Sequence, residues 1–403
     1  MKSMTKKLTA ALLLVTGAMT VQAQSADTIN VVTTAVPFLR ISPDSRAGAM
    51  GDVGVATSPD ANSAFWNLAK TPFATNNIGI GLTYTPWLKD LGLNDVYLLS
   101  LAGYYKLDDQ QAISASLRYF SLGNIQFTDE NGSNLQEGRP REFGIDVGYA
   151  RKLGSKIGLG VALRFIHSNL AGGVSQSGTN YKAGNAVAGD LSIFYNGTSE
   201  TNGGWNLGAT LTNLGSKIGY TNDAQQKDFI PANLGLGAAY TTVFDENNKL
   251  TFGMDIHKLL VPTPPQFRGD PNDPVAIRED SIKAAEYRSK SVIGSWFSSF
   301  GDAPGGFGEE LREFQLSLGA EYWYNNQFAF RAGYFWEDKT KGNRKYFTVG
   351  VGVKYNVFGF NFSYLVPSGN GTNRNPLSNT LRFGLVFDLD TKDAPASNSG
   401  SSN

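Results

Sequence analysis

The chain has 403 residues, with 35 Lys and Arg against 35 Asp and Glu. This zero formal net charge gives no electrostatic reason to expect a nucleic-acid partner. The absence of cysteine excludes disulfides, thiolate catalysis, cysteine-ligated metals and a lipoprotein anchor. Glycine is abundant, aromatic residues make up 12% and charged residues only 17%. Such a composition is typical of strands that face lipid on one side and a crowded lumen on the other.

The first 23 residues have the pattern of a cleaved export signal. Three lysines precede a short apolar run over residues 8–15, and Val21-Gln22-Ala23, followed by Gln24, fits a small-x-small cleavage site. The apolar run is well short of the ~20 residues that a helical span needs, which argues against a membrane anchor.

Residues 24–76 are predicted to form a periplasmic N-terminal segment and a hatch. The stretch 37–52 is rich in small residues and lacks period-two alternation, so it is a candidate to plug a barrel. Ser58 and Pro59 have the pattern of a helix start, with Ser58 as N-cap, and Phe65 and Trp66 would close that short helix.

From Asn77 onward, apolar residues alternate with glycines and polar residues. Such a period of two is characteristic of strands with one apolar face. The predicted strands are 77–85, 96–105, 112–120, 143–150, 157–167, 187–196, 205–213, 232–240, 250–257, 314–324, 328–336, 346–355, 357–365 and 379–389. We therefore expect an all-β protein in which residues 77–389 form a transmembrane antiparallel β-barrel of about 14 strands, because lipid offers no partner for an open sheet edge. A soluble sandwich is the alternative.

The connections between these strands alternate in length. Those after even-numbered strands are short, whereas one odd-numbered connection spans residues 258–313. Outer-membrane barrels have short periplasmic turns and long outer loops. The parity predicts an outer-membrane location, both termini in the periplasm, extracellular long loops and a disordered periplasmic tail over 390–403.

The long insertion is expected to be partly helical. Prolines break its first part, and Asp273-Pro274 could open a helix running towards Arg288. An apolar stripe at helical spacing follows, formed by Val292, Ile293, Trp296, Phe297 and Phe300. Two alternatives stay open: the stripe folds back over the barrel mouth, or it is a docking surface for another protein.

Motifs of enzymes are not found, so we expect no catalytic site, no cofactor and no metal. His167 and His257, the two histidines, each fall at a predicted strand end, and isolated histidines are poor candidates for metal ligands. The inward rows carry charges of both signs, for which a hydrogen-bonded ion network is favoured over a polar conduction path.

The run FLRISPDSRAGAMGDVGVAT over residues 38–57, continued by 63–67 and Lys70, resembles the N-terminal region of the PorV (LptO) family of the type IX secretion system. More distantly the chain is similar to the FadL-like 14-stranded barrels, in which an N-terminal hatch plugs the lumen. One departure is Asn67-Leu68-Ala69, where the family has Asn-Pro-Ala. The hatch residues that the resemblance indicates are Arg46, Gly48, Met50, Gly51, Asp52, Trp66 and Asn67.

The resemblance implies a non-enzymatic role in protein secretion in Bacteroidota. Proteins of this family bind the C-terminal domain of cargo proteins and shuttle them from the translocon barrel SprA (Sov) to the attachment complex with its sortase-like protein PorU. Loops 123–141, 171–186 and 262–308 would then bind cargo and translocon, with membrane lipids and lipopolysaccharide around the barrel. The alternatives are a FadL-like transporter of a hydrophobic small molecule and an enzyme acting on lipopolysaccharide.

Overall fold

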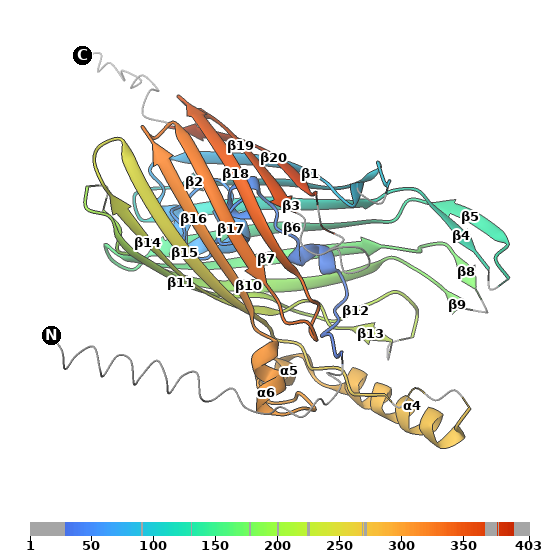
Figure 1. Cartoon of the computed structure of the whole chain (residues 1–403). Helices are drawn as coiled ribbons and strands as arrows, with labels where there is room; N and C mark the ends of the chain where they lie inside the picture. Colours follow the sequence, from blue (N-terminus) through green and yellow to red (C-terminus); the bar gives the residue numbers. More distant parts are fainter. Residues whose placement is uncertain are drawn as a thin grey trace, which may run out of the picture.

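Fourteen antiparallel strands form a closed barrel in the computed structural model, which describes residues 29–89, 92–129, 131–176, 179–199, 201–223, 226–267, 269, 272–366, 377 and 379–390. Each strand pairs with its neighbour along the barrel, and the first pairs with the last (Figure 1). The barrel strands are β1 (Ile78–Pro86), β2 (Val96–Lys106), β3 (Gln111–Leu122), β6 (Arg141–Lys152), β7 (Ile157–Asn169), β10 (Gly184–Asn196), β11 (Gly204–Gly215), β14 (Asn233–Val243), β15 (Asn248–Leu259), β16 (Gln315–Tyr324), β17 (Phe328–Trp336), β18 (Lys345–Tyr355), β19 (Phe358–Val366) and β20 (Leu381–Leu389). All fourteen predicted strands are confirmed, with ends shifted by a few residues. The proposed signal and the tail beyond residue 390 lie outside the described residues.

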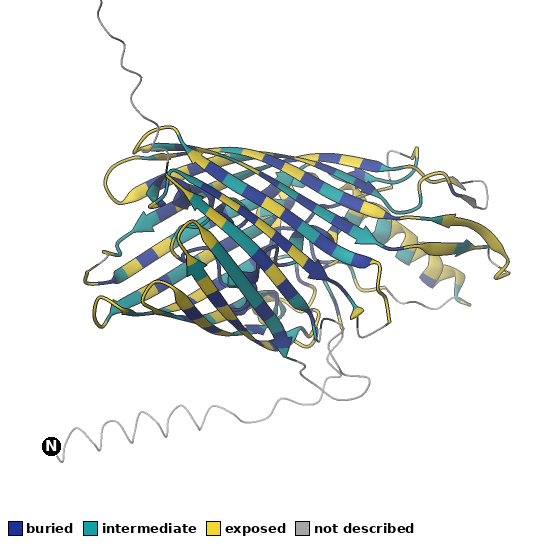
Figure 2. Ribbon diagram, turned by 90° about the horizontal axis from the view of Figure 1, so that it is seen from above, coloured by how far each residue is buried: buried dark blue, intermediate teal, exposed yellow. Residues whose placement is uncertain are grey.

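Exposed and buried residues alternate along the strands, as Figure 2 shows. In β18 the side chains of Phe347, Val349 and Val351 are exposed, whereas Thr348 and Gly350 between them are buried. The exposed rows are therefore the apolar ones, which is the reverse of a soluble sandwich and the arrangement of a barrel in lipid. Among the described residues, no helix has both the length and the apolar character to cross a bilayer.

The connections at the two ends of the barrel differ as the parity predicts. One end has short turns, such as Asn325–Gln327, where Asn325 and Asn326 both have positive φ and so favour a tight hairpin. The other end has the long connections, three of which carry small hairpins (Figure 1). These hairpins are β4 (Ile125–Thr128) with β5 (Asn134–Gly138), β8 (Ser175–Gln176) with β9 (Thr179–Asn180), and β12 (Ile218–Gly219) with β13 (Lys227–Asp228).

The chain before β1 runs through the barrel from the long-loop end to the short-turn end. It contains η1 (Pro37–Arg40), α2 (Ser45–Gly48), α3 (Ser63–Trp66) and η2 (Leu68–Phe73). At the long-loop end, the Asn30 amide donates to the Thr340 carbonyl between β17 and β18, at 3.0 Å. At the short-turn end, Lys106 Nζ donates to the Ala74 carbonyl at 3.0 Å.

This path differs from the expectation that both ends of the chain leave the barrel at the short-turn end. β20 does end there, but the first described residues lie among the long connections. Parity fixes only the direction of strands, and a segment that is not a strand is free to return through the lumen. The predicted helix start at Ser58 is also wrong, because α3 begins at Ser63. The Ser58 hydroxyl and carbonyl, which an N-cap would offer to the first turn, instead accept from the Arg46 guanidinium at 2.7 and 3.0 Å.

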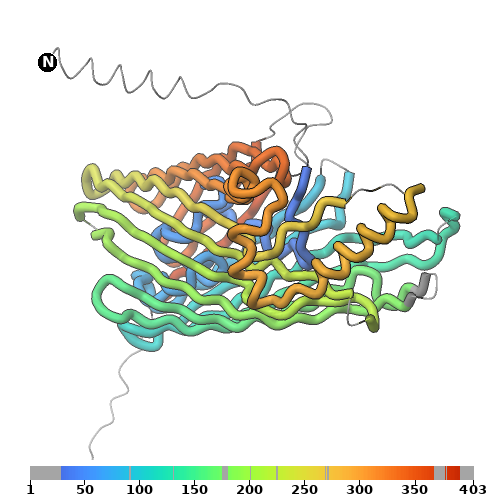
Figure 3. Tube along the Cα trace, turned by 90° about the horizontal axis from the view of Figure 1, so that it is seen from below, coloured from blue at the N-terminus to red at the C-terminus, as the bar shows by residue number. Residues whose placement is uncertain are grey.

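The insertion between β15 and β16 holds α4 (Pro274–Ser289), α5 (Val292–Ser298) and α6 (Phe307–Arg312). The predicted helix from Pro274 is confirmed, and the Asp273 side chain caps it by accepting the Val275 amide at 2.9 Å. Figure 3 shows the insertion, in yellow to orange, beside the end of the barrel where the long connections gather.

Candidate functional site

The hatch segment, residues 37–76, is held inside the barrel first by a group of buried charges. The Arg46 guanidinium donates to both carboxylate oxygens of Glu321 on β16, at 2.7 and 2.9 Å, and to Asp60 at 2.9 Å. Glu321 also accepts from Arg331 Nε on β17 at 2.7 Å. Asp44 caps α2 and so fixes the turn that presents Arg46. One wall carboxylate thus joins two guanidinium groups, one from the hatch and one from the wall.

A second attachment uses the hatch backbone. One carboxylate oxygen of Asp255 on β15 accepts the Gly54 and Val55 amides at 2.7 and 2.8 Å. Lys70 Nζ, itself buried, donates to the Gly54 carbonyl at 2.7 Å. Asn67 Nδ2 donates to the Val55 carbonyl and to the Ile193 carbonyl of β10, both at 3.0 Å. Hydrogen bonds to charged groups are among the stronger ones in proteins, so this part of the hatch is firmly held.

Glycines on the wall let the hatch approach closely. A Cβ at Gly333 would lie 2.0 Å from the Met50 carbonyl carbon, and one at Gly319 would lie 2.5 Å from the Met50 oxygen. Gly51 adopts φ +66° and donates its amide to Thr348 Oγ1 at 2.9 Å. The backbone of 50–51 therefore lies directly against the wall, which explains why a glycine is needed at both sides of this contact.

The remaining predicted hatch residues also have wall or internal partners. Asp52 accepts from the Tyr346 hydroxyl of β18 at 2.7 Å, and Gly48 packs against the side chain of Arg382 on β20. Trp66 Nε1 donates to Asp44. The structure therefore brings the seven predicted hatch residues into one body that contacts β10, β16, β17, β18 and β20.

The inward charges of the wall form a network, as the sequence favours. Arg164 on β7 donates to Asp146 on β6, and to Asp190 on β10 at 2.8 Å. Asn213 belongs to the same group. Its side-chain oxygen accepts from Arg164, and its backbone amide donates to Asp190 at 2.7 Å. These inward charges are thus paired with one another in a hydrogen-bonded ion network, which offsets the cost of burying them.

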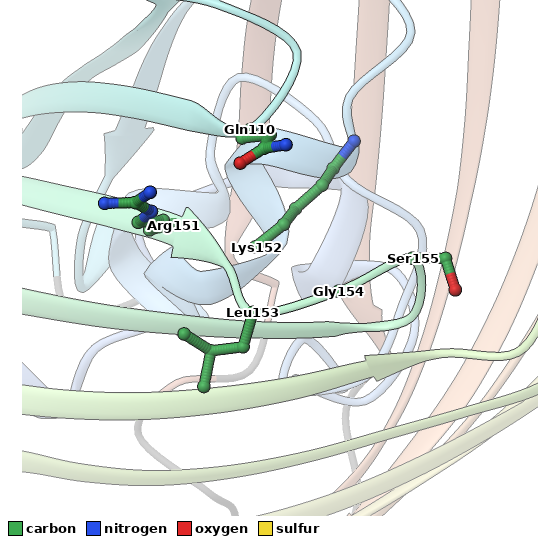
Figure 4. A pocket seen from close by; sticks show the side chains of 6 residues that line it. All are labelled: Gln110, Arg151, Lys152, Leu153, Gly154 and Ser155. Atoms are coloured by element: carbon green, nitrogen blue, oxygen red, sulfur yellow. The ribbon is translucent and has the colours of Figure 1, made fainter.

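A cavity of about 110 Å³ remains between the hatch and the wall. Its lining includes Arg40 and Trp66 of the hatch segment and Arg118 and Phe335 of the wall. Pockets that hold drug-sized ligands have volumes of roughly 300–1,000 Å³, so this cavity is too small for a lipid-sized molecule. An open, basic hollow lies at the short turns (Figure 4), where Lys152 Nζ is 4.8 Å from the Phe73 ring centroid.

The two histidines lie apart on β7 and β15. The His167 ring stacks on Phe143 with centroids 4.9 Å apart, and His257 Nδ1 is 3.2 Å from Asn233 Nδ2. Within the described ranges, no three His, Cys, Asp or Glu side chains are grouped so that they could hold a metal ion.

The apolar stripe predicted in the insertion is split between two faces. Val292 is half-buried against a small apolar cluster, and Trp296 is also half-buried. Ile293, Phe297 and Phe300 are exposed, with 64%, 75% and 47% of their surface accessible. The prediction of a single apolar face is wrong, because the buried side of α5 is occupied by Ser295 and, at its C-cap, by Ser299.

Sequence reasoning missed two exposed apolar residues of the neighbouring helix. Phe307 and Leu311 of α6 are 76% and 53% exposed. Their spacing of four residues places them on one helical face and was the available signal. The insertion therefore presents apolar side chains from both α5 and α6.

Buried ion pairs fix α6 to the barrel rim. Lys258 at the end of β15 donates to Glu313 at 2.6 Å and to Glu310 at 3.2 Å. Lys341 donates to Glu309 at 2.6 Å and to Glu313 at 3.0 Å. Although burial raises the pKa of Glu309, hydrogen bonds from Lys341 and from backbone hold it below its usual range.

Known proteins resemble this chain in two comparisons. The family model for the type IX secretion system protein PorV matches residues 23–266, which is more than half of the chain. No curated protein matches it.

Solved structures share its fold. The monoaromatic hydrocarbon channel CymD superposes with a TM-score of 0.51 at 12% identity, over 87% of this chain and 98% of CymD. The toluene transporter TbuX of Ralstonia pickettii gives 0.49 at 12% identity (87% and 99% covered), and a Pseudomonas aeruginosa FadL homologue gives 0.44 at 10% identity (89% and 99%). At this low identity, the likeness to CymD supports the barrel fold and nothing more. From the family match together with this barrel, we conclude that the chain belongs to the PorV family of outer-membrane proteins of the type IX secretion system.

Proposed function

We propose that this chain is a non-enzymatic component of type IX secretion that binds the C-terminal domain of cargo proteins. It would take cargo from the translocon barrel SprA (Sov) and deliver it to the attachment complex that contains PorU. The observation that carries this proposal is the exposed apolar surface of the insertion, formed by Ile293, Phe297, Phe300, Phe307 and Leu311. Exposed apolar surface rimmed by polar residues is typical of protein-binding sites.

The filled lumen supports a binding role rather than passage of protein through the barrel. A barrel of about 14 strands encloses a narrow interior. Here that interior also holds the hatch segment, which is attached through Glu321 and Asp255. Cargo would therefore be bound outside the barrel, at the long connections.

The proposed placement follows from the same features. The signal would be residues 1–23, and the exposed apolar rows would contact membrane lipids and lipopolysaccharide. The long connections, including 123–141, 171–186 and the insertion, would be extracellular, with the tail after residue 390 in the periplasm. This orientation puts the exposed insertion where secreted cargo arrives.

The experiment replaces the exposed phenylalanines by serine in the double variant Phe297→Ser/Phe307→Ser. Because these side chains are 75% and 76% exposed, the barrel is expected to fold and keep its heat-modifiable migration. Ile277→Ser on α4, where the side chain is 49% exposed, is the matched control. Co-purification with SprA, PorU and cargo from detergent-solubilised envelopes should fall for the double variant alone. Undiminished co-purification would remove the insertion from the binding surface.

The second candidate is a FadL-like transporter of a hydrophobic small molecule, which the fold shared with CymD favours. The cavity of about 110 Å³ and the attached hatch weigh against it. Native mass spectrometry that detects a stoichiometric apolar ligand, with uptake lost on deletion, would favour this alternative.

A further inference from the structure

The first described residues form a strap at the long-loop end of the barrel. The N-terminal strap, residues 29–36, is tied by Asn30 to two separate connections. The Asn30 amide donates to the Thr340 carbonyl at 3.0 Å, in the connection between β17 and β18. Its side-chain nitrogen donates to Glu309 Oε1 at 3.1 Å and to the Pro264 carbonyl at 3.3 Å, both in the insertion. One residue therefore joins the insertion to its neighbouring loop.

The strap also supplies an apolar contact beneath the insertion. Val32 is 7% exposed and belongs to a buried cluster with Phe229, Leu259 and Val261. Two insertion side chains pack on this cluster, Tyr287 at the end of α4 and Val292 at the start of α5. The junction between α4 and α5 therefore packs partly against Val32, which precedes it by about 260 positions in the chain.

The strap continues into the lumen without a break. The Ala35 amide donates to the Phe229 carbonyl at 2.9 Å, and Val36 is buried before η1 begins. The strap is thus anchored at one side by the hatch segment, which the wall holds through Glu321 and Asp255. An anchored segment of this kind can hold the insertion in place, whereas a loose terminus could not.

We propose that the N-terminal strap places the mature N-terminus on the same side of the barrel as the insertion and positions α5 and α6 for their partner. The positioning role rests on the proposed function, whereas the sidedness rests only on the proposed cleavage after Ala23. Asn30 and Val32 are the positioning residues, and they would act through the insertion.

Chain length supports the sidedness. With cleavage after Ala23, six residues would precede Asn30, and an extended chain covers ~3.3 Å per residue, so their reach is at most about 20 Å. The hydrocarbon core alone is about 30 Å thick. A mature N-terminus produced by this cleavage would therefore not reach the opposite end of the barrel.

Labelling of introduced cysteines tests the sidedness, because the chain has no native cysteine. Ser25→Cys reports on the N-terminus, Gly308→Cys on α6 and Glu246→Cys on the short turn between β14 and β15. A membrane-impermeant maleimide on intact cells should label the first two, and Glu246→Cys only after the outer membrane is permeabilised. Labelling of Ser25→Cys in step with Glu246→Cys would overturn the inference. If Ser25→Cys and Gly308→Cys both require permeabilisation, the strap inference stands and the proposed orientation fails.

A pair of adjacent substitutions tests the positioning role. Val32→Asp places a charge in the apolar cluster, whereas Thr33→Asp places the same charge at an exposed neighbour. For Val32→Asp we expect cleavage of the insertion in limited proteolysis at least tenfold faster, with a heat-modifiable barrel and reduced co-purification of SprA and cargo. Asn30→Ala, which removes only side-chain hydrogen bonds, should change the same quantities less.

The outcomes of this test are distinguishable. Equal protection of the insertion in Val32→Asp and Thr33→Asp would overturn the positioning role. Faster cleavage together with undiminished co-purification would support the positioning role and count against the proposed docking function of the insertion.

Discussion

Glu321→Gln should release the hatch from the wall. The Glu321 carboxylate accepts three hydrogen bonds from guanidinium groups, two from Arg46 at 2.7 and 2.9 Å and one from the buried Arg331 at 2.7 Å. A glutamine keeps one acceptor oxygen but turns an NH₂ group towards a cation. Both guanidinium groups then lose their shared counter-charge, although Arg46 retains Asp60 and Arg331 retains Asn361.

The size of the effect follows from the burial of the group. Glu321 and Arg331 are 2% and 4% exposed. Breaking a buried ion pair by removing one partner costs about 3–5 kcal/mol. Since 1.4 kcal/mol corresponds to a factor of ten, the population of the detached hatch should rise about 100- to 4,000-fold.

Hydrogen–deuterium exchange measures this population in detergent-solubilised protein. The reporting amides are Gly54 and Val55, which are bonded to Asp255 rather than to Glu321 and so exchange faster only if the hatch moves as a body. Glu137→Gln on the exposed β5 is the matched control. Protection of these amides that is the same in Glu321→Gln and wild type would refute the view that this charge group holds the hatch.

Three further predictions concern the wall and the insertion. Gly333→Val should prevent docking of the hatch and abolish heat-modifiable folding, because its Cβ would lie 2.0 Å from hatch backbone, whereas Gly359→Ala, with its nearest contact at 3.5 Å, should fold normally. Lys258→Met should leave the buried Glu310 carboxylate without its cation, although Glu313 retains Lys341, and make the insertion more sensitive to protease, by an amount corresponding to about 3–5 kcal/mol. The pKa of Glu309 is lowered in the folded protein, so the ionised carboxylate stabilises the folded insertion. This stabilisation should be complete above the usual pKa of about 4.5 and should be lost as the pH falls through the pKa of the folded protein. The protection of amides in the insertion, corrected for the pH dependence of intrinsic exchange, should therefore be constant above this usual pKa and fall as the pH drops below it, and Lys341→Met should weaken this dependence.

The barrel could be predicted from the sequence because its signal is local. Each strand has its own alternation of apolar with small or polar residues, as at Phe347, Val349 and Val351. Tight turns carry residues such as Asn325 and Asn326, which tolerate positive φ. Pairing of successive strands then follows from the short connections. None of these inferences needs information from residues that are far apart in the chain.

The arrangement inside the barrel could not be predicted in this way. Arg46 and Glu321 are 275 positions apart, and Asn30 and Glu309 are 279 apart. The resemblance of the hatch segment named one partner of each wall contact but not the other. The faces of α5 were also misjudged, because Ser295 is buried there by tertiary packing that the helical period does not report.

The course of residues 29–77 constrains the order of assembly. The segment enters at one rim and leaves at the other, and β1, to which it is joined, closes the cylinder by pairing with β20. If that seam formed first with the segment outside, the leading end would have to thread afterwards through an interior crowded with paired charges. The sheet must therefore close around residues 29–77 while they already lie in its interior. Any machinery that inserts this protein in the membrane must keep β1 and β20 unpaired until this segment is in place.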